Sequence, residues 1–203
     1  MLDVLPELIL FSVSAAFTPG PNNIMIMSSG VNFGARASMP HLFGICLGFP
    51  AMFLATGFGL GALFLNYPVL HMMIKVLGLT YLTYLAWQIA TSGKVERGER
   101  LGRPLTFFQA ALFQWVNPKA WIMGTSAIAA FTVVGQDLVP QVLLIGFVFL
   151  SMAFPSAGVW LAFGSSLKQL FENIVYLRVF NITMAILLMW SMRHTYMEVV
   201  GYL

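Results

Sequence analysis

Long apolar runs follow one another along the whole chain and are interrupted only by short polar segments. Six of these runs reach about 20 residues or more, the length that crosses a hydrocarbon core roughly 30 Å thick. The pattern predicts six membrane-spanning helices, at about residues 5–30, 40–64, 69–91, 107–131, 138–163 and 174–195. The longest polar stretch, TSGKVERGERLGR at residues 91–103, is too short for a soluble domain.

The composition supports a membrane protein. Of the 203 residues, 59% are hydrophobic and 8% are charged, whereas a soluble domain carries about 25% charged residues. We expect an all-α membrane protein with one transmembrane domain over residues 1–203. The first run lacks the charged segment and cleavage site of a signal peptide, so we expect it to be a retained span. The single cysteine, Cys46, excludes an intrachain disulfide and a cysteine metal cluster. No metal or cofactor is expected.

The basic residues are distributed unevenly between the predicted loops. The second and fourth loops, at residues 65–68 and 132–139, contain none. Those in the odd-numbered loops are Arg36, Lys94, Arg97, Arg100, Arg103, Lys168 and Arg178. The positive-inside rule therefore places the odd loops, including the basic loop at about 92–106, in the cytoplasm and both termini outside. Arg193 is the exception. The net charge of +3 thus reflects membrane topology, and the expected partner is the lipid bilayer, not nucleic acid.

Three predicted spans lie on each side of the basic loop, so two similar halves would have to be inverted. Repeat one would cover about 1–92 and repeat two about 107–203. Phe49-Pro50 in the second span recurs as Phe154-Pro155 in the fifth. The first span of each half is also interrupted, which predicts broken first and fourth helices. Paired broken helices in corresponding positions of two halves point to a transporter binding site.

The interruptions are TPGPNN at residues 18–23 and NPK at residues 117–119. Proline removes a hydrogen-bond donor, and in lipid each unsatisfied carbonyl costs several kcal/mol. Each broken segment must therefore be buried in protein or line an aqueous cavity. A half-helix N-terminus suits a carboxylate and the carbonyl end suits an ammonium, so a zwitterionic amino acid fits both. The alternative interpretation is a plain kink.

Lys119 lies about twelve residues into the fourth span, where an ammonium costs roughly 2.5–3.5 kcal/mol. The acidic residues, Asp3, Glu7, Glu96, Glu99, Asp137, Glu172 and Glu198, all fall in loops or near span ends. The partners left for Lys119 are freed carbonyls, the amides of Asn22, Asn23 and Asn117, or an anionic substrate group. Snorkelling to the interface is the alternative. The lack of deep carboxylates favours neutral over cationic amino acids as substrates.

Several motifs together resemble one known family. They are TPGPNN, Gly44 with Gly48 and Phe49, the run GLTYLTYLAWQIATS shortly after Lys75, and NPKAW in the fourth span. Over nearly the whole chain they resemble the LysE/RhtB amino-acid exporters, and the chain looks closest to the cysteine/O-acetylserine exporter branch. The resemblance implies six helices, the bacterial inner membrane, and efflux of amino acids or their derivatives driven by the proton gradient. Lysine-exporting relatives carry acids where this chain has Pro50 and Met123, which agrees with a neutral substrate.

The breaks and the resemblance define the candidate substrate-binding residues as Thr18, Pro19, Gly20, Pro21, Asn22, Asn23, Asn117, Pro118 and Lys119. Trp115 and Trp121, which flank the second break, are candidate pocket-lining residues. The glycines at 44, 48, 57, 59 and 61 suit close helix packing, within the chain or across a homodimer.

We interpret the chain as a secondary transporter exporting small neutral amino acids or their derivatives, with a proton as coupling ion. Lys119 is a candidate carrier of that proton. His41, His71 and His194 are expected to be interfacial residues, and Lys75 either snorkels or takes part in transport. A passive channel for small solutes is the alternative function. A membrane enzyme is disfavoured because the histidines are scattered and no carboxylate lies deep in a span, and a structural subunit would leave Lys119 unexplained.

Overall fold

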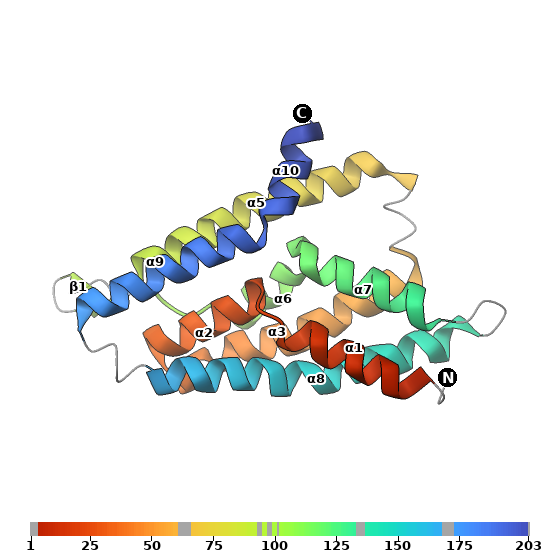
Figure 1. The fold of residues 1–203 in the computed structure, drawn as a ribbon, viewed down its shortest axis with the longest axis horizontal. Coiled ribbons are helices and arrows are strands. Elements are labelled where there is room, and N and C mark those ends of the chain that lie inside the picture. Colours follow the sequence, from red (N-terminus) through yellow and green to blue (C-terminus); the bar gives the residue numbers. More distant parts are fainter. Residues whose placement is uncertain are drawn as a thin grey trace.

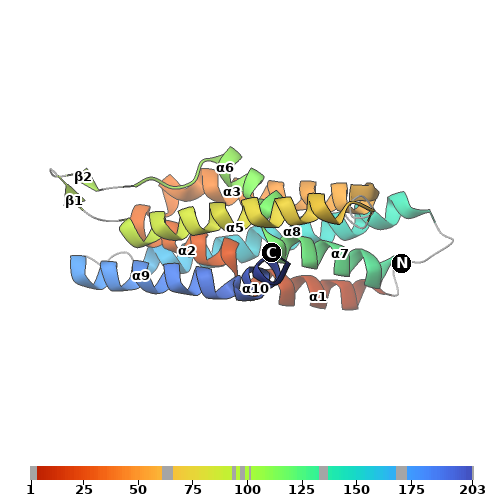
Figure 2. The ribbon, with the colours of Figure 1, turned by 90° about the horizontal axis from the view of Figure 1, so that it is seen from above.

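The structure is a computed structural model, and it describes residues 4–60, 66–92, 95–96, 99–100, 102–132, 137–167 and 173–202. Within these residues the chain forms an elongated bundle whose helices run mostly along its long axis (Figures 1 and 2). The helices are α1 (Leu5–Phe17), α2 (Pro21–Phe33), α3 (Ala35–Ala55), α5 (Pro68–Thr91), α6 (Phe107–Phe113), α7 (Pro118–Phe131), α8 (Leu138–Leu167), α9 (Ile174–Ser191) and α10 (Arg193–Tyr202). A π-helical turn, η2 (Thr56–Leu60), follows α3, and a 3₁₀ turn, η3 (Gln114–Val116), follows α6.

The predicted all-α class is confirmed for the described part of the chain. The first predicted span corresponds to α1 and α2, and the fourth to α6, η3 and α7. α3 begins at Ala35, five residues earlier than predicted, because Gly34 (φ 86°) ends α2 and turns the chain directly into the next helix. The predicted end of the second span, at residue 64, lies outside the described residues.

Two elements were not predicted. Helix α10 follows α9 after a short interruption at Met192. In the basic loop, two-residue strands β1 (Val95–Glu96) and β2 (Glu99–Arg100) form a small antiparallel ribbon, in which Val95 pairs with Arg100. This ribbon lies at one end of the bundle and the N-terminus at the other (Figures 1 and 2).

Among the described helices, three are long and apolar enough to cross a membrane: Ala35–Gly59, Leu138–Leu167 and Ile174–Ser191. Leu5–Phe17 and Phe107–Val116 are apolar but shorter. A 13-residue helix is only about 20 Å long, so α1 needs α2 to approach membrane thickness. The breaks therefore explain why no single helix in the first or fourth predicted span is long enough to cross a membrane alone.

Buried side chains of the described helices form three core clusters, of which the smallest joins α2, α3, α6 and α8. One cluster joins α2, α5 and α9 through residues such as Met27, Leu82 and Leu188, and α5 and α9 lie side by side in both views (Figures 1 and 2). Another joins α1, α3, α7 and α8. Large apolar side chains also cover the outside: Trp87 is 68% exposed and Trp190 60% exposed. Such an apolar exterior suits contact with lipid.

Glycines allow the closest helix contacts. A Cβ on Gly44 would collide with the Phe107 carbonyl of α6, and one on Gly48 would lie 2.6 Å from the Cα of Ala111. On α8, a Cβ on Gly164 would collide with the Met27 carbonyl of α2. The predicted close packing of Gly44 and Gly48 thus occurs within the chain.

The basic and titratable residues near the helix ends differ in environment. Lys75 of α5 forms an ion pair with Glu198 of α10, which gives it a partner that sequence reasoning did not assign. His194 is exposed near the start of α10, and its place at a membrane interface stays a prediction. The prediction that His41 is interfacial was wrong: it is 1% exposed, inside the bundle on α3. The side chain of His71 lies outside the described part of the structure.

Replacing Gly164 by alanine tests the contact between α8 and α2. We expect Gly164→Ala to destabilise the protein by about 1–3 kcal/mol, because the added methyl group meets rigid backbone. Gly158 lies on the same helix, and a methyl group added there would meet no neighbouring atom within 4 Å, so Gly158→Ala should leave stability unchanged or raise it. Cys46, fully buried and the sole cysteine of the sequence, allows thermal unfolding in detergent to be followed with a thiol-reactive dye. Equal midpoints for the two variants would contradict the close approach.

Candidate functional site

The first break lies between α1 and α2. Thr18 and Gly20 each precede a proline, which disfavours helical geometry at both positions. Both are extended: Thr18 has φ −60° and ψ 131°, and Gly20 has φ −171° and ψ −177°. Pro21 then begins α2, where a missing N–H carries no penalty. The predicted break in the first span is confirmed.

The second break has the same local cause. Asn117 precedes Pro118 and is extended, with φ −84° and ψ 106°. The chain tightens into the 3₁₀ turn η3 before it and begins α7 after it. The Asn117 Oδ1 atom accepts a hydrogen bond of 3.1 Å from the Lys119 backbone N–H, so this side chain caps α7. The predicted break in the fourth span is also confirmed.

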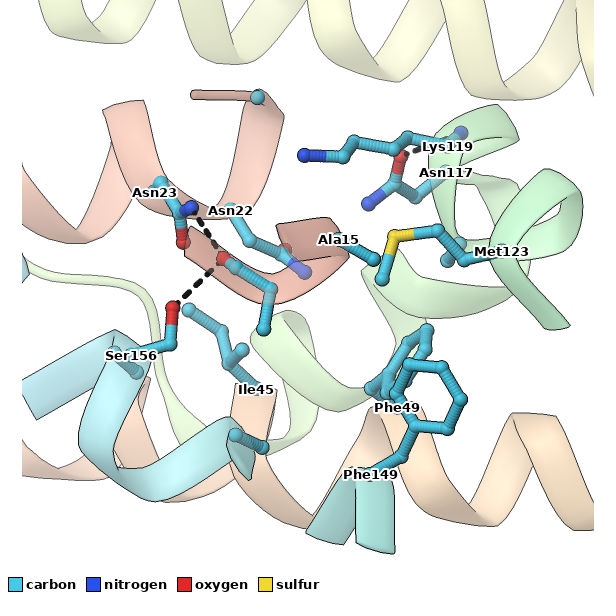
Figure 3. Close-up of a pocket in the computed structure, with 15 residues that line it drawn as sticks. Ala15, Asn22, Asn23, Ile45, Phe49, Asn117, Lys119, Met123, Phe149 and Ser156 are labelled. Carbon is cyan, nitrogen blue, oxygen red and sulfur yellow. Dashed lines mark hydrogen bonds between the residues drawn. The ribbon is translucent and has the colours of Figure 1, made fainter. Parts of the chain in front are cut away.

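Two carbonyls at the first break, those of Ala16 and Thr18, are bound by side chains of the protein. The Asn23 Nδ2 atom donates to the carbonyl oxygens of Ala16 (2.8 Å) and Thr18 (3.0 Å). Ser156 of α8 donates to the same Ala16 oxygen at 2.7 Å (Figure 3). Asn23 therefore replaces the missing helical donors, and Ser156 is a contributor that the sequence did not single out.

Lys119 joins the two breaks. Its Nζ atom donates to the Thr18 carbonyl oxygen at 2.7 Å. A Cβ on Gly20 would lie 2.8 Å from the Lys119 Cδ and 2.9 Å from its Nζ, so glycine leaves room for this side chain. The prediction that Lys119 finds a freed carbonyl in place of a carboxylate is confirmed for the hydrogen bond observed here.

An amide pair makes a second link between the breaks. Asn22 Nδ2 donates to Gln114 Oε1 (2.8 Å), and Gln114 Nε2 donates back to Asn22 Oδ1 (3.0 Å). Gln114 also donates to the Ala110 carbonyl and is fully buried. Sequence reasoning missed Gln114, although an amide in an apolar run three residues before Asn117 is a signal, because a buried amide needs partners.

A cavity of about 540 Å³, including the part open to solvent, lies between the breaks. Its lining residues are Ala15, Ala16, Gly20, Asn22, Asn23, Ile45, Phe49, Asn117, Lys119, Ala120, Met123, Phe149, Ala153, Ser156 and Ala157. Lys119 and the asparagines lie on one side, and the rings of Phe49 and Phe149 on the other (Figure 3).

Not every candidate residue lines this cavity. The described lining residues do not include four of the candidates, Thr18, Pro19, Pro21 and Pro118. These four residues determine the backbone conformation at the breaks. Trp115 and Trp121 are also outside the lining set. Instead Trp121 Nε1 donates to the Trp115 carbonyl at 2.8 Å, and the two rings lie 6.4 Å apart. These two contacts connect the residues on either side of the second break and stabilise its conformation.

The two helix N-termini at the breaks differ in their capacity to bind an anion. In α7 the Asn117 side chain occupies the Lys119 N–H. In α2 the N-cap is Gly20, without a side-chain cap, and the N–H groups of Asn22 and Asn23 have no carbonyl partner within the helix. The α2 N-terminus and the Lys119 ammonium therefore form the positive part of the site.

Two carbonyls near the end of α1 already have hydrogen-bond partners within the protein. A carbonyl oxygen has two lone pairs, and both the Ala16 and the Thr18 oxygens already accept two hydrogen bonds. Three of these four bonds come from neutral side chains, and the fourth comes from Lys119. Movement of Lys119 would free an acceptor on the Thr18 oxygen without disturbing the amide network.

Comparison with known proteins identifies the family of the chain. The model of the LysE type translocator family matches residues 13–191, which include both breaks. Cysteine/O-acetylserine efflux proteins of Escherichia coli (strain K12) and Shigella flexneri are each 32% identical over 182 residues, 89% of this chain and 91% of theirs. No solved structure matches the chain. With a family match over most of its length, the chain belongs to the LysE type translocators, a family of transporters and not of enzymes.

Proposed function

We propose that the chain exports small neutral amino acids or their derivatives from the cytoplasm, and that the cavity between the two breaks holds the substrate. The observation that carries this proposal is the combination of an open helix N-terminus, the Lys119 ammonium and an apolar wall in one cavity. The names of the related efflux proteins support it, since cysteine and O-acetylserine are small and have uncharged side chains at acidic to neutral pH.

The substrate carboxylate would bind between the α2 N-terminus and Lys119. Charge-assisted hydrogen bonds to an ammonium are stronger than neutral ones, so the carboxylate competes with the Thr18 carbonyl for Lys119. As Lys119 turns toward the carboxylate, the Thr18 oxygen loses its 2.7 Å bond and becomes available to the substrate ammonium. The zwitterion thus takes over an interaction that the empty site makes internally.

The rest of the lining favours a neutral, compact side chain. Ile45, Phe49, Met123 and Phe149 form an apolar wall, and the described lining residues include no Asp or Glu. A cationic side chain placed there would be desolvated without a counter-ion, which is strongly unfavourable. We therefore expect that lysine and arginine are not substrates.

The proposed membrane arrangement has six crossings in two inverted repeats, in the bacterial inner membrane. The basic loop would be cytoplasmic and the N-terminus outside. Supporting this, the basic loop and the N-terminus lie at opposite ends of the bundle (Figure 1), and each half contains one broken helix and one proline-containing helix, α3 with Pro50 and α8 with Pro155. Rocking of one repeat against the other would expose the midplane site alternately to the two sides.

Transport by purified protein in liposomes tests the proposal. We expect saturable movement of O-acetylserine and cysteine, faster when a pH gradient is imposed, and no movement of lysine. The pH gradient matters because a proton is the proposed coupling ion. Non-saturable flux that ignores the pH gradient would indicate a passive channel, and no movement of any amino acid by folded protein would contradict export.

A pair of lysine variants tests the ammonium. We expect Lys119→Ala to lower the transport efficiency for O-acetylserine about 10- to 100-fold, because a hydrogen bond to a charged group contributes about 1.5–3 kcal/mol. Lys75→Ala is the matched control, since Lys75 pairs with Glu198 outside the cavity. Initial transport rates in liposomes are measured for both variants. A similar fall in rate for Lys119→Ala and Lys75→Ala would contradict a specific role of Lys119 in substrate binding.

Gly20→Ala tests the position of Lys119 without removing its charge. The added methyl group would lie 2.8–2.9 Å from the Lys119 side chain, which is flexible and can move away. The extended conformation of Gly20 is open to alanine. We therefore expect transport to fall about tenfold or more while the thermal unfolding midpoint changes little. A variant that transports normally would show that the Lys119–Thr18 contact is dispensable.

A further inference from the structure

A second cavity lies at the other end of α2, toward the basic loop. Its polar lining residues come from α2, α3, the end of α5 and the segment before α6, and they are Ser28, Ser29, Asn32, His41, Gln88, Ser92 and Arg103. A shallower hollow shares Gln88, Ser92 and Arg103 with it and continues toward Trp87 and Thr91. The second cavity therefore opens at the basic-loop end of the bundle.

Two buried side chains in this cavity have no partner among the described residues. Both ring nitrogens of His41 and the Oγ atom of Ser28 make no hydrogen bond, although the residues are only 1% and 2% exposed. Neighbouring polar groups are satisfied: Ser29 pairs with Ser38 (2.9 Å), and Asn32 pairs with Asn181 (2.7 Å). A buried polar atom without a partner destabilises a fold, so these unsatisfied groups call for a ligand.

The charges identify the class of that ligand. Arg103 is the one charged side chain among the described lining residues, and no Asp or Glu is among them. The serine hydroxyl, the N–H of a neutral imidazole and the guanidinium are all donors. A carboxylate accepts several hydrogen bonds and carries the charge complementary to Arg103.

The two cavities lie along one side of α2. Asn22, Met25, Ser29 and Asn32 recur at intervals of three and four residues, which places them on one helix face. Asn22 lines the first cavity, whereas Met25, Ser29 and Asn32 line the second. Ten residues of helix span about 15 Å, and buried Met25 lies between the two polar groups.

We propose that the second cavity is an entry site that binds the carboxylate of the substrate on the basic-loop side, before the substrate passes Met25 to reach the breaks. This rests on the proposed function for the identity of the solute. The unsatisfied Ser28 hydroxyl and the protonated ring nitrogen of His41 then have a role: they lack an acceptor in the empty protein, and the carboxylate supplies it.

The test uses a thiol placed at the rim. In a Cys46→Ala background, Gln88→Cys puts a reporter on a half-buried residue shared by the cavity and the outer hollow. We expect O-acetylserine to slow its labelling by a membrane-impermeant thiol reagent at least about fivefold, in a saturable manner. 2-Aminoethyl acetate, the same molecule without the carboxylate, should give no protection, and protection equal to that of O-acetylserine would overturn the proposal. Failure of O-acetylserine to protect would also overturn it.

Matched serine variants locate the binding. Adding Ser28→Ala should weaken protection about tenfold without lowering the thermal unfolding midpoint. Ser165 of α8 also has a buried, unpartnered hydroxyl but does not line the cavity, so Ser165→Ala should leave protection unchanged. Equal effects of the two variants would contradict the site.

A further variant separates the entry site from the site between the breaks. Protection should persist in Lys119→Ala, where the first cavity has lost its ammonium, and its loss there would overturn an independent entry site. If wild-type protein transports O-acetylserine but shows no protection, only the entry site fails. If protection is present and transport absent, the proposed function fails while the carboxylate site stands.

Discussion

Main-chain carbonyls freed in the middle of a membrane segment must find donors within the protein, because the surrounding hydrocarbon offers none. This requirement accounts for the contacts that hold the centre of the molecule together. Asn23, Ser156 and Lys119 come from three different helices, and all three donate to the carbonyls of Ala16 and Thr18. The break in α1–α2 therefore fixes where α7 and α8 must lie, and the cavity follows from their convergence.

The positions of the breaks could be predicted because they depend on local chemistry. A residue before proline disfavours helical geometry. The non-helical conformation of Thr18, Gly20 and Asn117 can therefore be predicted from the proline that follows each of them. The six apolar runs are also local properties, and they correspond to the observed helices in the described residues. The predicted isolation of Lys119 from carboxylates was likewise readable, since it follows from where the acidic residues stand in the chain.

Features that depend on pairing between distant residues could not be predicted in the same way. Gln114 pairs with Asn22 across 92 positions, and Lys75 pairs with Glu198 across 123. His41 lies near the start of α3, a place that indicates an interface, whereas the structure buries it beside a cavity that residues of α2 and α5 also line. The ribbon in the basic loop and helix α10 have too little apolar periodicity to stand out.

Polar side chains at the two cavities along α2 differ in their hydrogen bonding. Those at the first cavity have partners within the protein, whereas some at the second have none among the described residues. At the first cavity the side chains of Asn22, Asn23 and Asn117 each make hydrogen bonds within the protein, so their removal would disturb the fold, and the adjustable group is the flexible Lys119 side chain. At the second cavity His41 and Ser28 are buried and have no hydrogen-bond partners among the described residues. A group that must release a substrate benefits from weak, separable contacts, whereas a group that holds a break open needs strong, permanent ones. A solute moving along α2 would therefore meet unpaired donors first and an exchangeable ammonium second, an order that favours passage over trapping.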